Sequence, residues 1–390
     1  MEDYKTLFQE ALICKQNNNP DEAEELYLKV LELEPDLTEA YYNLATIYYD
    51  RNDCQKAVDC YKKILEINPD DSEVKYFLSL AYFKMKNYAE GEKYFENRLC
   101  RKSSIMSQEK TYPNLTKSAP VYSGEIAKDK TVYTYYEAGF GDMIMFARYL
   151  PLLKERVGKV IFKPQKELVN LFKENNFGCE IMGIFQPENT IHFDYHIPIM
   201  SLPYALSLKG EEIFTLRGGY MHANPAKSAE YKAKYFDNDK FKIGIKWQGN
   251  TMYDRGRVIT VESFFKLFDI PDTKFYSCQT FEGSQEIEKI KARYDIVDLG
   301  STFKDFSDTA AALDNLDLVI SNDSSLAHLA GAMGKKCLVL LPYIYNWRWH
   351  TDLSICDWYE SVKIFKQKTP DDWRGAFDDV YDFLINLLAK

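Results

Sequence analysis

The clearest structural signal in this chain lies in residues Leu316–His350, LDLVISNDSSLAHLAGAMGKKCLVLLPYIYNWRWH. Its apolar run Leu316–Ser321 has the length of a buried strand, and a second such run covers Cys337–Leu341. Between them, the segment from Ser324 to Gly334 has the spacing of a short amphipathic helix. Strand, helix and strand in this order form a βαβ unit, which predicts a parallel sheet.

The turn between the first strand and the helix is the expected ligand site, because parallel sheets bind ligands beyond the carboxyl ends of their strands. Here the strand runs into Asn322 and Asp323, and the helix opens with Ser324 and Ser325. A helix start directs unpaired backbone N–H groups and a partial positive charge at the ligand, which favours a phosphate. One turn further, His328 is either a packed core residue or a contact to the same ligand.

Length and composition exclude several classes of protein. A chain of 390 residues is too long for one compact core, so we expect two or three domains. A formal net charge of −10 argues against a nucleic-acid partner. The eight cysteines are scattered, which is typical of reduced thiols. The N-terminus is charged and amphipathic, and no apolar run is long enough for a membrane span. These features predict a soluble, cytoplasmic protein.

Residues 1–101 repeat with a period of about 34 residues, so that Pro35 falls on Pro69. Small residues at helix crossings, aromatic residues in the grooves and a proline after the second helix are typical of stacked helical hairpins. We interpret most of these residues as core, and the concave surface as a place for a peptide or partner. Asn43 is the candidate contact on that surface, although no ladder of asparagines accompanies it.

A second α/β signal follows a polar linker at 102–117. The β-rich run Thr131–Glu137 leads into Gly139 and Gly141 and then into a helical pattern, MIMFARYLPLL. Strand, glycine turn and helix open a Rossmann-like domain, in which glycines let the backbone approach a ligand closely. Asp142 stands at the helix start. It is either a helix cap or a carboxylate that removes a proton from an incoming hydroxyl, and the residues alone leave both open.

A metal site is the other possibility in this half. His192, Asp194 and His196 would share one face of a strand over Thr190–Pro198. Without further ligands on neighbouring elements, we interpret them as structural or surface residues. No metal and no cofactor are therefore expected.

Alternating strand and helix patterns continue to the C-terminus and again predict a parallel sheet. We expect strands over Lys242–Trp247, Lys274–Gln279, Asp295–Leu299 and Ser361–Phe365, with an amphipathic helix over Asp371–Lys390. The polar residues at or after the first two strands are Lys246, Gln248, Asn250, Arg255, Arg257 and Gln279. Amide and cationic side chains at strand ends are suited to grip a pyrophosphate or a sugar. For the two arginines, a solvated loop is the other interpretation.

Four ordered motifs resemble bacterial tetratricopeptide-repeat glycosyltransferases. They are EAGFGDMIMFARYLP (Glu137–Pro151), GIKWQGN (Gly244–Asn250), NDSSLAHLAGAMGK (Asn322–Lys335) and NWRW (Asn346–Trp349). These enzymes belong with the heptosyltransferase-like GT-B family and are distantly similar to protein O-GlcNAc transferases. The resemblance runs from the repeats to nearly the C-terminus.

The resemblance implies an α/β chain of repeats followed by a GT-B fold. The expected boundaries are about three tetratricopeptide repeats (1–101), a linker (102–117), an N-terminal Rossmann-like domain on the acceptor side (118–235), a C-terminal Rossmann-like domain on the nucleotide-sugar side (236–368) and a final helix (369–390). That final helix is expected to pack back on the first Rossmann-like domain.

The resemblance also implies an inverting, metal-independent transfer of a sugar from a nucleotide-diphosphate donor, with Asp142 as general base. The acceptor would be a protein, peptide or glycan, possibly held by the repeats. By position, Asp323, Ser324 and Ser325 match the donor-phosphate turn of the family. The other donor-binding candidates come from the residues themselves: Gly139, Gly141, Lys246, Gln248, Asn250, Arg257, Gln279 and His328. The loop 251–258 departs from the family pattern, so the roles of Arg255 and Arg257 and the identity of the sugar stay open.

A different class of function is also compatible with these residues. The chain could be a non-catalytic adaptor, in which the repeats recruit a partner and the GT-B half is silent. A dinucleotide-dependent oxidoreductase is disfavoured, because Glu137–Asp142 lacks the full G-x-G-x-x-G run.

Overall fold

The computed structural model of the chain describes residues 3–101, 119–183, 191–249 and 255–389. It divides into two compact units, which are treated separately below. The repeat unit comprises Met1–Asn114 together with a later segment, Ile344–Asp352. The α/β unit comprises Leu115–Tyr343 and Leu353–Lys390.

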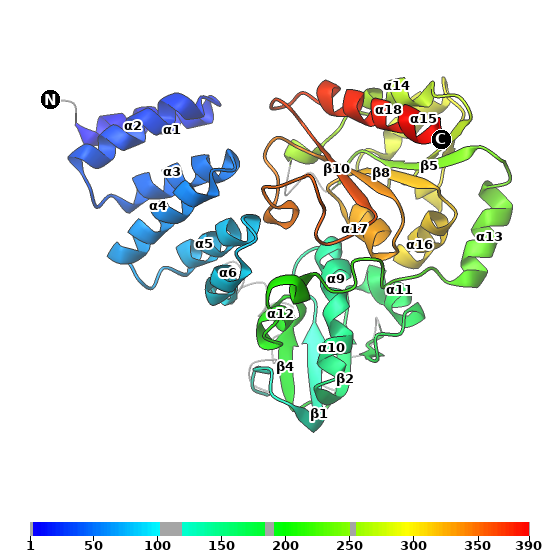
Figure 1. Cartoon of the computed structure of the whole chain (residues 1–390), viewed down its shortest axis with the longest axis horizontal. Coiled ribbons are helices and arrows are strands. Elements are labelled where there is room, and N and C mark those ends of the chain that lie inside the picture. Colours follow the sequence, from blue (N-terminus) through cyan, green and yellow to red (C-terminus); the bar gives the residue numbers. More distant parts are fainter. Residues whose placement is uncertain (1–2, 102–118, 184–190, 250–254, 390) are drawn as a thin grey trace. The chain divides into compact units, whose positions relative to one another are not determined.

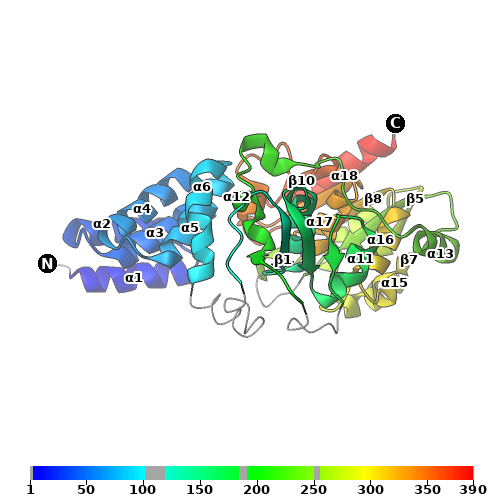
Figure 2. The same ribbon diagram turned by 90° about the horizontal axis from the view of Figure 1, so that it is seen from below.

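The repeat unit is built from antiparallel helical hairpins, as the sequence period predicts (Figures 1 and 2). Its helices are α1 (Tyr4–Gln16), α2 (Pro20–Leu33), α3 (Thr38–Asp50), α4 (Cys54–Ile67), α5 (Ser72–Lys84) and α6 (Tyr88–Phe95). The repeated aromatic residues Tyr27 and Tyr61 are buried in its core. Each hairpin turn has a residue in the left-handed region at the equivalent position: Asn18, Asn52 and Lys86, with φ of 59°, 64° and 62°. The turns therefore repeat as faithfully as the core.

The first sheet of the α/β unit is parallel and has the order β3-β2-β1-β4. Its strands are β1 (Ala127–Tyr135), β2 (Val157–Lys163), β3 (Glu180–Ile181) and β4 (Tyr195–Pro198). The helices that follow them are α9 (Phe140–Phe146), α10 (Leu150–Lys154), α11 (Val169–Glu174) and α12 (Leu202–Ala205). Strand followed by helix, with parallel pairing, is the arrangement that a Rossmann-like domain requires.

The second sheet is also parallel and has the order β10-β9-β8-β5-β6-β7. Its strands are β5 (Phe241–Lys246), β6 (Thr273–Ser277), β7 (Ile296–Asp298), β8 (Leu318–Asn322), β9 (Cys337–Leu341) and β10 (Val362–Lys366). Its helices are α14 (Phe265–Phe268), α15 (Ile287–Lys291), α16 (Phe306–Asp314), α17 (Ser325–Ala332) and α18 (Arg374–Leu388). The repeats followed by two parallel α/β sheets confirm the expected fold class.

The position of the C-terminal helix differs from our expectation. The sequence predicts that residues 369–390 pack on the first Rossmann-like domain, and this prediction is wrong. The buried stripe Ala376, Phe377, Val380 and Leu384 on α18 belongs to the core of the second sheet, together with Ile243 and Ile245 of β5. Figure 1 shows α18 beside α14 over that sheet. The reason is that α14 and α15 are short and leave apolar sheet surface for α18 to cover.

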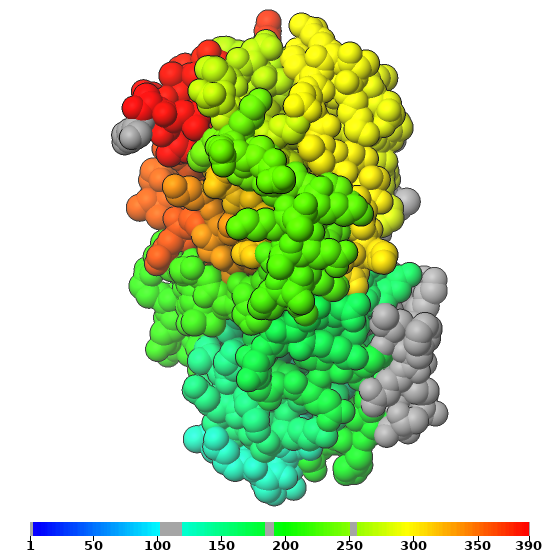
Figure 3. Space-filling view, turned by 90° about the vertical axis from the view of Figure 1, so that its right-hand side faces the viewer, coloured from blue at the N-terminus to red at the C-terminus, as the bar shows by residue number. Residues whose placement is uncertain are grey.

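The connection between the two sheets contains a packed helix. The polar, lysine-rich stretch after His222 contains a helix, α13 (Pro225–Tyr235), whose start is capped by the side chain of Asn224. This helix packs against α16 of the second sheet. In the space-filling view, its green segment lies over the yellow surface of that half (Figure 3). The polar residues of this stretch are therefore the solvent side of a packed helix.

No helix within the described ranges combines the length and the apolar composition that crossing a bilayer requires.

Candidate functional site

The carboxyl ends of β5, β6 and β8 meet at one edge of the second sheet, and α17 begins there. Ser324 is the N-cap of α17, and its hydroxyl hydrogen-bonds with Ser321 Oγ at 3.0 Å. The backbone N–H groups of Ser325 and Leu326 donate to no other described residue. They are the unsatisfied donors that a helix start presents. This edge therefore offers amides and a positive dipole end to an anion.

The negative charge of Asp323 is compensated by a neighbouring arginine, so this carboxylate repels an anion at the edge less strongly. Its Oδ2 forms an ion pair with Arg257 Nε at 3.4 Å, and Arg257 Nη1 also donates to the carbonyl of Asp323 at 3.3 Å. The neighbouring Asn322 is fully buried, and its Nδ2 donates to the carbonyl of Arg257 at 3.0 Å. Its Oδ1 accepts no hydrogen bond within the described structure. A buried acceptor without a donor is rare in proteins, and a bound ligand with an N–H or O–H group would satisfy it.

Lys246, the last residue of β5, is a buried cation at the same edge. Its side chain lies on the face opposite Ile245, because side chains alternate along a strand. Lys246 is only 7% exposed. Its hydrogen-bond partner among the described residues is Thr280 Oγ1, at a long 3.5 Å. Burial lowers the pKa of Lys246 to about 8. An ammonium held here with so little compensation favours a negatively charged ligand.

Gln279 has a different position from the other predicted donor contacts. Its Oε1 accepts from the backbone N–H groups of Trp247 (3.1 Å) and Gln248 (3.0 Å). Its Nε2 donates to the carbonyls of Gln248, Thr280 and Glu282. These bonds join the loop after β5 to the loop after β6. Gln279 therefore holds these two loops in a fixed position relative to each other.

The start of α9 approaches this edge from the first sheet. Asp142 lies in the first turn of α9, and its Oδ2 accepts from the backbone N–H of Gly139 at 3.1 Å. Helices α9 and α17 pack against each other. A Cβ atom added to Gly141 would lie 2.7 Å from Cδ2 of His328 and 3.4 Å from its Nε2. The glycine thus allows the two helix starts to approach closely, one residue before Asp142.

A buried network behind His328 connects the two sheets. His328 Nδ1 hydrogen-bonds with the hydroxyl of Tyr359 at 3.1 Å. The Arg148 guanidinium lies over the Tyr359 ring, 5.1 Å from its centroid, and donates to the carbonyl of Trp358 at 3.1 Å. Arg148 also donates to the carbonyl of Thr215 at 3.1 Å. Thr215 belongs to the half of the first sheet, whereas Trp358 belongs to the half of the second sheet. These bonds compensate a fully buried charge and tie the start of α17 to the first half.

The structure brings most of the predicted site residues together at one edge. The exceptions are Asn250, which lies outside the described residues, and Arg255, whose side chain does. Sequence reasoning placed Asn322 in the expected turn but gave it no role, and it did not identify Arg148 or Tyr359 as site residues. A signal for Arg148 was present, because it is the one charged residue in the apolar pattern MIMFARYLPLL.

Two weaker candidates are engaged elsewhere. Asn43 accepts from Lys15 Nζ at 3.0 Å and donates to the carbonyl of Glu39, so its amide is already bound within the repeats. Asp194 accepts from the backbone N–H of Thr131, and His196 is buried in the first sheet. No group of three potential metal ligands occurs within the described ranges.

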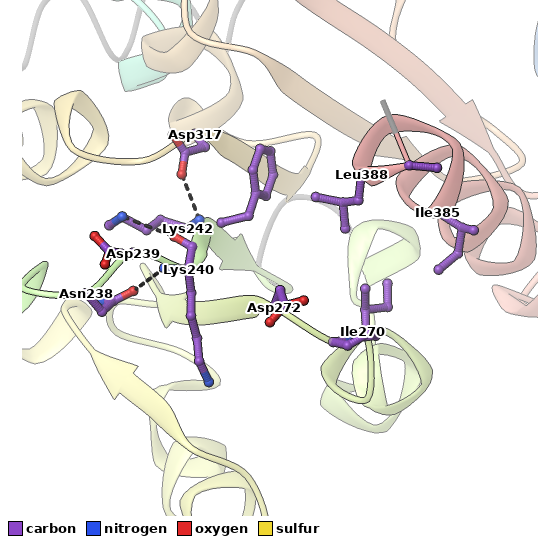
Figure 4. Close-up of a pocket in the computed structure, with 12 residues that line it drawn as sticks. Asn238, Asp239, Lys240, Lys242, Ile270, Asp272, Asp317, Ile385 and Leu388 are labelled. Carbon is purple, nitrogen blue, oxygen red and sulfur yellow. Dashed lines mark hydrogen bonds between the residues drawn. The ribbon is translucent and has the colours of Figure 1, made fainter.

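A hollow elsewhere on the α/β unit does not coincide with this edge. It has a volume of about 740 Å³ and is lined by Lys240, Asp272 and Ile385 among others (Figure 4). These residues lie where β5 and β6 begin or on α18, at the opposite edge of the sheet. Ligands of parallel sheets bind beyond the carboxyl ends of the strands, so this hollow is not the expected site.

Comparisons with known proteins agree with this division of the chain. Residues 4–37, 38–71 and 72–97 match tetratricopeptide-repeat models. Residues 276–345 match the model for glycosyltransferase family 9 (heptosyltransferase). Residues 4–97 are thus similar to tetratricopeptide repeats, and residues 276–345 are similar to part of a glycosyltransferase family 9 domain. The residues that this model matches include Gln279, β8, α17 and β9.

One curated relative, Protein FlbA of Caulobacter vibrioides, is 25% identical over 298 residues, which cover 69% of this chain and 48% of the relative. The chain thus spans about half the length of the curated relative that it matches.

Solved structures similar to this chain include a family 9 glycosyl transferase of Veillonella parvula (11% identity, 66% of this chain, 92% of that chain, TM-score 0.46). Another is the ADP-heptose lps heptosyltransferase II of E. coli (11% identity, 66% of this chain, 98% of that chain, TM-score 0.46). A third is an O-GlcNAc transferase of Thermobaculum terrenum (11% identity, 98% of this chain, 89% of that chain, TM-score 0.31).

Proposed function

We propose that this chain is an inverting glycosyltransferase that moves a sugar from a nucleotide-diphosphate donor to a protein or glycan acceptor without a metal ion. The observation that carries this proposal is the close approach of two helix starts. Gly141 of α9 lies against His328 of α17, and Asp142 follows Gly141 in the first turn of α9.

The donor diphosphate is proposed to bind at the start of α17. The free amides of Ser325 and Leu326 and the ammonium of Lys246 would balance its charge. As the bond between the anomeric carbon and the phosphate oxygen breaks, the leaving diphosphate keeps the electron pair and gains negative charge. Groups already fixed around that charge stabilise the transition state without reorganising. The donor's hydroxyl or amino groups would supply the missing partner of Asn322 Oδ1.

The acceptor is proposed to be activated by Asp142. Its carboxylate takes the proton of the acceptor hydroxyl while that oxygen forms the new bond to the anomeric carbon. Attack from the face opposite the leaving group inverts the configuration. The N–H of Gly139 holds the carboxylate in place, so the cap and the base are compatible roles of the same side chain.

Calorimetry with UDP, GDP, ADP and CMP compounds tests the proposal. We expect one nucleoside diphosphate to bind to the full chain with a micromolar to millimolar dissociation constant. Binding of a partner by the repeats together with no affinity for any of the four nucleotides would favour the adaptor function instead.

Asp142→Asn tests the proposed base. Asparagine keeps an oxygen that accepts from Gly139 N–H but cannot take a proton at neutral pH, so the helix start stays intact. We expect turnover of the nucleotide-sugar to fall by about 10²–10⁴-fold, with donor affinity unchanged. Turnover equal to that of the wild type would remove Asp142 as the base.

A further inference from the structure

The connection between β9 and β10 has an unusual form. These strands are parallel neighbours, and such pairs are normally joined by a helix that packs back on their own sheet. Here residues 342–361 are fully described and contain one helical turn, η11 (Trp347–Trp349). The middle of this connection, Ile344–Asp352, belongs to the repeat unit. We call it the strap.

The strap is bound to the last repeat mainly by aromatic packing. The ring of Trp347 lies 5.2 Å from that of Phe83 on α5 and 6.3 Å from that of Phe95 on α6. Trp347 is 3% exposed and Trp349 is 1% exposed. Burial of two indoles is a large apolar contribution for so short a segment. The ring of Trp347 thus lies among the aromatic residues of the last repeat.

Polar contacts give the strap a defined register on the repeat. The hydroxyl of Tyr88 hydrogen-bonds with Nε2 of His350 at 2.7 Å. The backbone N–H of Thr351 donates to the carbonyl of Lys84 at 2.9 Å. The ammonium of Lys84 lies 4.5 Å from the ring centroid of Tyr345. Directed bonds of this kind distinguish a built binding site from general apolar coverage.

Both ends of the same connection are fixed in the α/β unit. Ahead of the strap, Tyr343 N–H donates to the side chain of Gln367 at 2.9 Å. Behind it, the carbonyl of Trp358 accepts from Arg148, and Tyr359 bonds with His328. The ring of Tyr359 packs flat on α17, since a Cβ atom on Gly331 would lie 2.4 Å from it. The chain that leaves the strap therefore becomes part of the support of the proposed donor site.

We propose that the last repeat is a binding site for this chain's own strap, and that strap binding holds Tyr359 in place against His328. The repeats then act as a positioning element for the donor site. This proposal rests on the proposed function only for its nucleotide readout.

The physical basis is conformational entropy. A connection of this length without a packed helix would sample many conformations if its middle were free. Anchoring the strap restricts the short segment that follows it, which includes Trp358 and Tyr359. Loss of the anchor would let the hydroxyl of Tyr359 move away from His328 Nδ1 for part of the time. Coupling between two sites of this kind typically changes affinity by about 5–150-fold.

Trp347→Ala in the full chain tests the proposal. We expect about tenfold weaker binding of the nucleoside diphosphate that the wild type binds best. We also expect faster amide hydrogen exchange in peptides covering residues 353–362. Trp347→Phe keeps an aromatic ring between Phe83 and Phe95, so it should restore most of both signals.

Val30→Ala is the matched control. Val30 is fully buried in the core of the repeats, on α2, and its truncation leaves a cavity without altering the strap. We expect it to lower the unfolding temperature but leave nucleotide affinity and exchange at 353–362 unchanged. The proposal fails if Trp347→Ala also lowers only the unfolding temperature, or if Val30→Ala weakens the nucleotide equally.

The hydrogen-exchange measurement separates this proposal from the proposed function. If the wild type binds none of the nucleotides, the glycosyltransferase mechanism is lost. The strap proposal then still predicts faster exchange at 353–362 in Trp347→Ala. Unchanged exchange there would overturn it whatever the nucleotide data show.

Discussion

The two units each bury a lysine, and the two lysines have different surroundings. Lys84 of the repeat unit is fully buried and donates to the carbonyl of Tyr49 at 3.3 Å. Its ammonium lies 4.3 Å from the ring of Tyr49 and 4.5 Å from that of Tyr345. Lys246 of the α/β unit is 7% exposed, and its partner among the described residues is a single hydroxyl at 3.5 Å.

This difference separates a structural charge from one that is suited to bind a ligand. Lys84 obtains its compensation from carbonyl and ring contacts within the chain, and it acts against the rise that burial causes in the pKa of Asp50. Lys246 has little compensation, and burial lowers its pKa to about 8. A buried cation with so weak a partner destabilises the fold, which supports the proposal that an anion binds at this strand end.

For the two buried lysines, the larger expected effect concerns Lys246→Met. We expect nucleoside diphosphate affinity to fall by about 10–100-fold, because a charged hydrogen bond to the phosphate contributes about 1.5–3 kcal/mol. The free energy of unfolding should stay equal or rise, since an uncompensated buried charge is removed. Calorimetry and denaturant unfolding measure the two quantities.

Lys242→Met is the control for that prediction. Lys242 lies on the same strand near its opposite end, where its Nζ donates to the carbonyl of Lys240. Its loss should leave affinity unchanged. Equal losses of affinity in both variants would show that net charge, and not the position of Lys246, is responsible.

Lys84→Met tests the other side of the comparison. We expect the free energy of unfolding to fall by about 2 kcal/mol, because two cation–π contacts and one hydrogen bond are lost from a buried site. Lys75→Met on the same helix removes a half-buried cation that lies 3.9 Å from Asp70, and it should change stability by less than about 0.5 kcal/mol. A stable Lys84→Met protein would contradict the structural role of this charge.

Gly141→Ala tests the approach of α9 to α17. The added methyl group would overlap the ring of His328, whose position Tyr359 fixes from behind. We expect a loss of about 1–3 kcal/mol in unfolding free energy. Gly183→Ala is the control, because a Cβ atom there meets nothing within 4 Å. If thermal unfolding shows the two variants to be equally stable, the helix starts are further apart than described.

The pH dependence of nucleotide binding gives an effect that is small near neutral pH. Below about pH 8 Lys246 is charged with or without ligand, so affinity is constant with respect to this group. A bound diphosphate raises the pKa of the ammonium, so above pH 8 binding takes up a proton and affinity falls by up to about tenfold per pH unit.

The free energy of unfolding changes with pH in the opposite direction to the nucleotide affinity. The pKa of Lys246 is lowered from 10.5, so the unfolded chain binds the additional proton between about pH 8 and 10.5. The contribution of Lys246 to unfolding free energy therefore rises with pH in that window. Calorimetry of the wild type and Lys246→Met from pH 7 to 9.5 checks the binding prediction, and the variant should lose the slope.

Sequence patterns were sufficient for most elements of the fold. The predicted strand Cys337–Leu341 coincides with β9, and the helix expected after Ser324 is α17. Both are regular apolar patterns, which depend on local periodicity. The docking of α18 could not be predicted in the same way. Its apolar stripe fits any apolar sheet surface, and which sheet has surface left depends on the lengths of the other helices.

The parts of the candidate site that follow from strand ends and helix starts could be predicted from the sequence. The parts that depend on contacts between distant residues could not. The turn Asp323–Ser325 follows from strand ends and helix starts. That Gln279 joins two loops depends on residues more than thirty positions away, such as Trp247. The same holds for Arg148, whose acceptors come from both halves of the α/β unit.

The strap has a practical consequence for producing parts of this protein. A chain cut so that it starts at Leu115 would retain Tyr345 and Trp347 but lose the helices that they contact. These rings would then form an exposed apolar patch, which promotes self-association of the fragment. Insolubility of such a fragment would therefore reflect the missing cover and would give no information about the stability of its two sheets.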